Sequence, residues 1–95
     1  MYKIAYSKQA AQDIKNLKAA GLEKKTKELI AIMKKDPFSN PPEYEALVGN
    51  LKGFFSRRIN IQHRLVYQIV SEPLIENGIE YDGIIKIVRM WTHYE

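Results

Sequence analysis

The sequence predicts an α+β domain in which two N-terminal helices pack on one face of a mainly antiparallel, twisted sheet, in the order β-α-α-β-β-β. Two observations carry this prediction. Apolar residues recur at helical spacing only before Pro37, whereas the chain after residue 50 is rich in alternating β-branched and aromatic residues. With 95 residues, the chain fits one domain over residues 1–95.

The first third of the chain contains a strand and a helix. Residues 2–6 alternate in the manner of a β-strand, and Ser7 is a suitable N-cap for the helix that follows. Residues 8–19 place their apolar side chains at helical spacing, and Gly21 ends this helix. The segment therefore predicts a β-α unit.

A second helix is predicted over residues 22–35. Its apolar side chains share one face, and lysines and glutamates occupy the other, which is typical of a solvated helix surface. Pro37 prevents continuation of the helix, and the proline-rich residues 36–42 form a stiff connector. Residues 43–48 then lead to a Gly-Asn turn signal.

The C-terminal half predicts the sheet. Residues 54–59 and 64–70 form a hairpin, and residues 83–95 form a final strand that runs almost to the C-terminus. Residues 71–80 carry an Asn-Gly pair, a strong tight-turn signal, and form a protruding loop or a small extra hairpin. These strands complete the sheet that the two helices cover.

Composition narrows the class of protein. The 15 lysines and arginines exceed the 11 acidic residues, for a net charge of +4, which favours a polyanionic partner such as nucleic acid, the ribosome or an acidic protein. The chain has no cysteine, no apolar run of membrane-spanning length and no signal-peptide pattern, so we expect a cytoplasmic protein that is not membrane-bound. A core this small leaves room only for a shallow, open active-site groove.

Strand alternation sorts the side chains of the hairpin onto two faces. If the turn is residues 60–62, Arg58 lies opposite Arg64. One face is then apolar and packs under the helices, with Arg57 as its exception and His63 on the same side; the other face is more polar and meets solvent or a ligand. The apolar face comprises Phe55, Arg57, Ile59, Leu65, Tyr67 and Ile69, and the polar face Phe54, Ser56, Arg58, Arg64, Val66 and Gln68.

Two arginines directly across a sheet repel one another, at a cost comparable to the roughly 0.2–1 kcal/mol that a good pair contributes. Such a pair is tolerated where an anion neutralises it, and the planar guanidinium suits a phosphate. Arg58 and Arg64 are therefore candidate phosphate ligands. Two alternatives stay open: both arginines pair with acidic side chains, or the register differs by one residue.

Cleavage of RNA through the ribose 2′-hydroxyl needs a base, an acid and cations around the phosphorus. The chain has two histidines to serve as acid, His63 and His93. The parity of His63 favours a structural role, whereas His93 lies near the C-terminus, where a histidine is either incidental or within reach of a substrate. Spacing does not choose among the carboxylates, which include Glu43, Glu45, Glu72 and Glu80.

Four motifs resemble one known family. They are Leu-x-Gly-Phe-x-Ser-Arg-Arg-Ile at 51–59, His-Arg-Leu-Val-Tyr at 63–67, a terminal His-Tyr at 93–94 and Asp-Pro-Phe at 36–38. In order and spacing they resemble the YoeB/Txe branch of the RelE/ParE toxin superfamily over nearly the whole chain, except residues 72–83. The resemblance implies the RelE-like microbial RNase fold.

It also implies a ribosome-dependent mRNA endoribonuclease, the toxin of a type II toxin–antitoxin pair, which leaves a 2′,3′-cyclic phosphate and a 5′-hydroxyl and inhibits translation. The family's general base falls on Glu45, its phosphate-stabilising arginines on Arg58 and Arg64, and its general acid on His93. The aromatic Tyr94 would orient or stack on a base. The resemblance implies neither a metal nor a cofactor.

Three departures from the family pattern stand out. Val48 replaces a lysine common in the family, a loss for which Lys52 is a candidate substitute in substrate binding. Glu95 adds a carboxylate after His-Tyr, and residues 72–83 lengthen the last hairpin. The last feature would alter contacts with the ribosome or with the antitoxin.

The implied partners are the ribosome, mRNA and a small antitoxin whose acidic, partly disordered segment covers the basic groove. The oligomeric state is open, a homodimer included. Two alternative functions remain: a ParE-like toxin that inhibits gyrase without cleaving RNA, and a non-catalytic basic RNA-binding protein.

Overall fold

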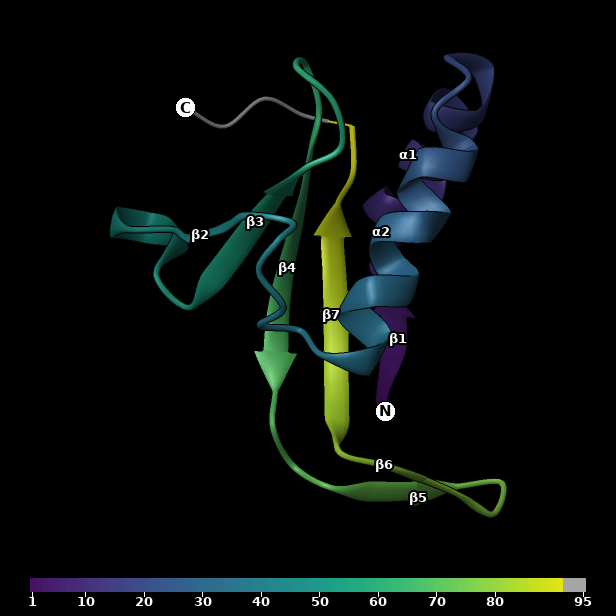
Figure 1. Cartoon of the computed structure of the whole chain (residues 1–95), viewed down its shortest axis with the longest axis vertical. Coiled ribbons are helices and arrows are strands. Elements are labelled where there is room, and N and C mark those ends of the chain that lie inside the picture. The colour runs from purple at the N-terminus through teal and green to yellow at the C-terminus, as the bar shows by residue number, and fades with distance from the viewer. Residues whose placement is uncertain (92–95) are drawn as a thin grey trace.

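The computed structural model describes residues 1–91. Within this range, helices α1 and α2 lie on one face of a five-stranded sheet with the order β1-β7-β4-β3-β2 (Figure 1). Strand β1 runs parallel to β7, and the other neighbours are antiparallel, so the predicted α+β class is confirmed. The elements are β1 Tyr2–Tyr6, α1 Lys8–Ala19, α2 Glu23–Lys35, β2 Tyr44–Ala46, the 3-10 turn η1 Gly49–Leu51, β3 Phe54–Arg58, β4 Arg64–Val70, β5 Leu74–Glu76, β6 Ile79–Tyr81 and β7 Gly83–Arg89.

The predicted helix boundaries are confirmed to within a residue. The Ser7 hydroxyl accepts a hydrogen bond from the Ala10 N–H at 2.9 Å, as an N-cap does, and donates to the Val88 carbonyl at 2.8 Å. Gly21 takes a φ of 75°, which a residue with a Cβ rarely adopts, and so turns the chain between the helices. Ser7 thereby fixes the start of α1 against β7, the strand that leads to the C-terminus.

The core lies between the helices and the sheet. Ala10 and Leu17 of α1 and Met33 of α2 are at most 1% exposed, and they meet fully buried side chains of the two central strands. The sheet contributes Leu65, Tyr67, Ile85 and Ile87. Removing one such side chain costs about 2–5 kcal/mol, so this layer holds β4 and β7 rigidly.

Residues 74–81 form a small hairpin, the second of the two alternatives predicted for residues 71–80. Strands β5 and β6 pair only with each other, and Asn77 and Gly78 at their turn both have positive φ. The hairpin extends from the end of the sheet at the bottom of Figure 1. Lys3 of β1 forms an ion pair with Glu76, which ties the hairpin to the sheet.

The final strand is shorter than predicted. The sequence pattern favours a strand over 83–95, but β7 ends at Arg89. The physical reason is a competing acceptor: the Met90 N–H donates to the buried Asp13 carboxylate of α1 at 2.9 Å instead of to a neighbouring strand. No helix within residues 1–91 is long and apolar enough to cross a membrane.

Candidate active site

The hairpin of β3 and β4 has the predicted register. Arg58 lies opposite Arg64, and the Ile59 N–H donates to the His63 carbonyl at 2.8 Å. The Asn60 side chain closes the turn by accepting from the His63 N–H at 2.7 Å. The two arginines are therefore cross-strand partners of the same parity, and Arg58 also lines a second pocket together with side chains of α2.

A pocket of about 250 Å³ lies beside these arginines. Glu45 of β2 lines it together with Arg58 and Arg64, and Pro42 and Glu43 complete its wall. The carboxylate reaches this place because β2 pairs with β3, with Glu45 opposite Ser56. The sheet thus gathers the expected base and both expected phosphate ligands at one site.

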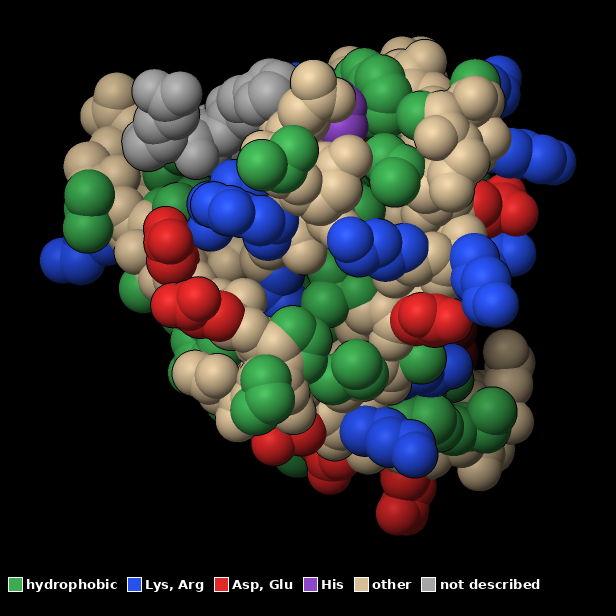
Figure 2. Space-filling model, turned by 45° about the horizontal axis from the view of Figure 1, so that its top comes forward, with side chains coloured by type: hydrophobic (Ala, Val, Ile, Leu, Met, Phe, Trp, Pro, Cys, Tyr) green, Lys and Arg blue, Asp and Glu red, His purple; other side chains and the backbone are tan. Residues whose placement is uncertain are grey.

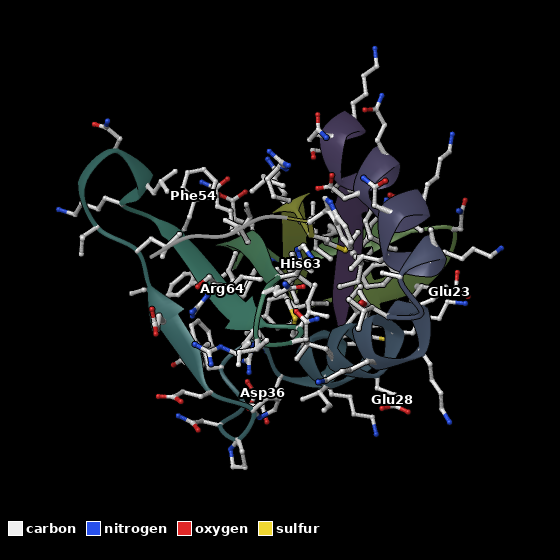
Figure 3. All side chains as sticks on the ribbon, turned by 90° about the horizontal axis from the view of Figure 1, so that it is seen from above. Glu23, Glu28, Asp36, Phe54, His63 and Arg64 are labelled. Carbon is white, nitrogen blue, oxygen red and sulfur yellow. The ribbon has the colours of Figure 1, made fainter. Side chains whose placement is uncertain are left out.

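Glu45 and Arg64 form an ion pair at this pocket, with 3.3 Å between Oε1 and Nη2. The Arg64 side chain is 14% exposed and the Glu45 side chain 60% exposed. The carboxylate is therefore open to a large substrate, while the arginine is held in the wall. Figure 3 places Arg64 beside strands β3 and β4. One alternative from the sequence, that the arginines pair with acidic side chains, holds for Arg64.

Ser56 differs from its sequence-based placement. Strand alternation places it on the polar, outward face, yet it is 0% exposed. Its neighbour on β4, Val66, belongs to the same face and is 1% exposed. The Arg64 side chain bends back along the sheet, and its Nε donates to the Ser56 hydroxyl at 3.1 Å. Sequence reasoning missed this contact; the one available signal was that Ser56 shares a face with Arg64 and lies diagonally across from it.

Arg57 points to the opposite face and is 0% exposed. Its guanidinium donates to the Pro37 carbonyl at 2.8 Å, to the Ser39 carbonyl at 2.9 Å and to the Pro42 carbonyl. It also donates to the Tyr67 hydroxyl at 3.1 Å. Arg57 therefore anchors the connector that delivers the chain to β2, as its core-facing parity predicts.

The same cation influences its aromatic neighbours. The Arg57 guanidinium lies 4.9 Å from the centre of the Tyr44 ring, a cation–π contact. Burial raises the pKa of the Tyr67 hydroxyl, and the nearby Arg57 charge partly opposes this. Tyr67 therefore stays a neutral acceptor for Arg57 near neutral pH.

His63 lies on the buried side, in agreement with its parity. Its ring is stacked on Trp91, with 3.8 Å between the ring centres and 14° between the planes. Figure 3 shows it closer to the helix layer than Arg64 is. His63 is not among the residues that line the pocket of Glu45, Arg58 and Arg64.

Three expected site residues are absent from the lining of the pocket as the described residues give it: one lies elsewhere, and two are outside the described range. Lys52 follows η1, is exposed and does not line the pocket. His93 and Tyr94 lie outside the residues that the structure describes. The roles expected for these three residues therefore stay predictions.

The buried carboxylate of Asp13 fixes the end of β7. Asp13 is 1% exposed and accepts hydrogen bonds from Gln9, Arg89 and the Met90 N–H at 2.9–3.1 Å. Burial raises the pKa of its carboxyl, but these hydrogen bonds and the Arg89 charge outweigh that effect and hold the pKa below its ordinary value. Asp13 is thus a structural anion.

One face of the molecule carries both signs of charge. On the face shown in Figure 2, basic side chains (blue) are interspersed with acidic ones (red). The net charge of +4 is therefore not spread there as a continuous basic patch.

Among residues 1–91, no three His, Cys, Asp or Glu side chains are grouped so that they could hold a metal ion.

Comparisons with known proteins bear on this fold and this site. A YoeB-like toxin family model, of bacterial type II toxin–antitoxin systems, matches residues 6–94. The toxin YoeB of Escherichia coli (strain K12) is 41% identical over 58 residues, 61% of this chain and 69% of that protein.

Solved structures agree. The toxin in a YoeB–YefM toxin–antitoxin heterotetramer from Staphylococcus aureus is 31% identical, with a TM-score of 0.71 over 99% of each chain. A YoeB/ParE toxin from Agrobacterium tumefaciens shares the fold, with a TM-score of 0.79 over 97% of this chain and 99% of that one, at 24% identity. The chain belongs to the family of YoeB-like toxins of bacterial type II toxin–antitoxin systems.

Proposed function

We propose that this toxin is an endoribonuclease that cleaves mRNA on the ribosome and so inhibits translation. The observation that carries the proposal is the pocket in which Glu45, Arg58 and Arg64 meet. A carboxylate beside two guanidinium groups matches the needs of a reaction in which a hydroxyl is deprotonated next to a phosphate. The Glu45 side chain is 60% exposed, and such an accessible carboxylate suits a polymer substrate.

In the proposed reaction, Glu45 accepts the proton of a ribose 2′-hydroxyl, and that oxygen attacks the adjacent phosphorus. The bond from phosphorus to the 5′-oxygen breaks, and His93 donates a proton to the departing oxygen. The products are a 2′,3′-cyclic phosphate and a 5′-hydroxyl. Arg58 and Arg64 stabilise the charge that accumulates on the phosphoryl oxygens, and Tyr94 and Lys52 contact the RNA.

Two partners follow from this proposal. One is the ribosome with its mRNA. The other is an antitoxin, since the Staphylococcus aureus relative was solved in a YoeB–YefM toxin–antitoxin complex. We propose a small antitoxin with an acidic segment that covers the arginines, because a carboxylate-rich chain complements them. A dimer of the toxin has also been solved from Staphylococcus aureus, and a homodimer of this chain is proposed on that likeness.

The test adds the purified toxin to translating ribosomes and maps the 5′ and 3′ ends of the mRNA. Wild-type protein is expected to produce cyclic-phosphate ends, and Glu45→Gln or His93→Ala to reduce cleavage by about a hundredfold or more. Glu80→Gln, on the distant β6, is the matched control for loss of one carboxylate and is expected to cleave normally.

Two results contradict the proposal. One is inhibition of gyrase supercoiling by a protein that leaves mRNA intact, as expected of a ParE-like toxin. The other is growth inhibition that Glu45→Gln leaves unchanged, as expected of a non-catalytic RNA-binding protein.

A further inference from the structure

Ser56 carries a buried hydroxyl that contacts Arg64, one of the residues that line the pocket. It lies in the middle of β3, opposite Glu45 on β2 and Val66 on β4, and none of its surface is exposed. Its hydroxyl oxygen accepts the Arg64 Nε–H at 3.1 Å. A buried hydroxyl that meets a pocket arginine in this way acts on the geometry of that arginine.

The two contacts of Arg64 fall on one edge of its guanidinium. The Nε–H and one N–H of Nη2 point in the same direction, and they face Ser56 Oγ at 3.1 Å and Glu45 Oε1 at 3.3 Å. Among the contacts within residues 1–91, this edge is the one in use. The second edge, formed by Nη1 and Nη2, points in another direction. The distance between its two nitrogens equals that between Nε and Nη2, so this edge also suits a pair of phosphate oxygens.

The Ser56 contact also separates two cations. Arg58 and Arg64 are cross-strand partners, and their guanidinium groups repel when they extend in parallel. Because Ser56 lies two residues before Arg58 on β3, a bond to it draws the Arg64 side chain back along the sheet. Arg58 stays exposed while Arg64 is held in the wall.

We infer that Ser56 is a positioning residue: it locks the Arg64 guanidinium so that its Nη1–Nη2 edge receives the RNA phosphate while Glu45 keeps its place beside Nη2. This inference rests on the proposed function, and it adds a residue that does not touch the reacting atoms. A guanidinium that is already fixed loses less rotational freedom when the phosphodiester binds. Ser56 therefore lowers the entropic cost of binding the phosphodiester.

A double-mutant cycle tests the inference by cleavage of mRNA on ribosomes. Ser56→Ala is expected to lower the cleavage rate roughly tenfold, the value of one hydrogen bond to a charged group. In an Arg64→Ala background, the same change is expected to have no further effect, because Ser56 acts through Arg64. Ser71→Ala, an exposed serine after β4, is the matched control. Full activity of Ser56→Ala, or equal losses in both backgrounds, overturns the inference.

A second measurement separates this inference from the proposed function. The exchange of the Arg64 Nε proton with water is followed by NMR, and its signal is assigned by its loss in Arg64→Lys. Exchange is expected to be about tenfold faster in Ser56→Ala than in wild type or Ser71→Ala. Unchanged exchange overturns the inference even if the wild type cleaves RNA. A wild type that fails to cleave contradicts the proposed function, and the exchange result still decides whether Ser56 holds Arg64.

Discussion

Arg57 and Arg58 follow one another on β3, yet Arg57 is completely buried and Arg58 is exposed. Strand alternation sends them to opposite faces of the sheet. Arg57 is enclosed by three carbonyl groups of the connector and by Tyr67, whereas Arg58 lines the pocket with Glu45. Two identical side chains thus occupy separate places, one in the interior and one at the candidate active site.

The burial of Arg57 predicts a large loss of stability on conservative substitution. A lysine keeps the charge but lacks the planar fork that serves several carbonyls at once, so Arg57→Lys leaves buried oxygens unpaired. We expect it to lower the free energy of unfolding by about 2–4 kcal/mol, measured by urea denaturation. Arg58→Lys is the matched control, with a change within about 0.5 kcal/mol. Equal stability of the two variants would contradict the anchoring role of Arg57.

For Arg58 we expect the opposite result, in which substitution affects RNA cleavage and not stability. Its removal relieves the repulsion from Arg64 across the sheet, so we expect Arg58→Ala to leave the free energy of unfolding unchanged or to raise it by up to about 1 kcal/mol. RNA cleavage is expected to fall by about a hundredfold, because the variant loses a proposed phosphate ligand. Urea denaturation and mRNA end mapping measure the two effects. A clear loss of stability would identify Arg58 as structural instead.

Much of this arrangement follows from local sequence. Ser7, Gly21 and Pro37 mark the ends of the helices because capping, positive φ and the missing proline N–H are properties of single residues. The opposition of Arg58 and Arg64 follows from the length of the turn and the alternation of the strands. These features needed no knowledge of distant contacts.

The features that the sequence did not predict depend on long-range partners. The end of β7 is set by Asp13, which lies 76 positions before Arg89. Ser56 is buried where alternation placed it toward solvent, and its partner Arg64 is an arginine that bends back over the strand. The two-residue period of a strand assigns each side chain to one face of the sheet. It does not predict where the terminal group of a long side chain lies on that face.

The stack of His63 on Trp91 predicts a spectroscopic signature. Trp91 is the single tryptophan of the chain, so tryptophan fluorescence reports on the surroundings of this one ring, which include the stacked His63. We expect His63→Ala to shift the emission to longer wavelength and to destabilise the fold by about 1–2 kcal/mol, because a stacked ring is lost. His63→Phe keeps a flat ring and is expected to retain the emission and RNA cleavage. Unchanged emission in His63→Ala would show that the two rings do not stack in solution.

Asp13 predicts how stability depends on pH. Its pKa in the folded state lies below the ordinary value of 3.8, so the ionised carboxylate stabilises the fold at every pH above that value. This stabilisation is lost as the pH falls below about 4 and through the lower folded-state pKa. Asp13→Asn replaces one acceptor oxygen with a donor, which then faces either Gln9 or both Arg89 and Met90. We expect this change to cost on the order of 2 kcal/mol at pH 7.

The diagnostic result for Asp13 is a change of slope. Urea denaturation between about pH 2 and 7 is expected to show a steeper acid loss in wild type than in Asp13→Asn, because the variant has no proton to take up at this position. Glu28→Gln removes an exposed carboxylate of α2 and is expected to keep the wild-type slope. Identical slopes for wild type and Asp13→Asn would mean that the hydrogen bonds from Gln9, Arg89 and Met90 do not favour the ionised form.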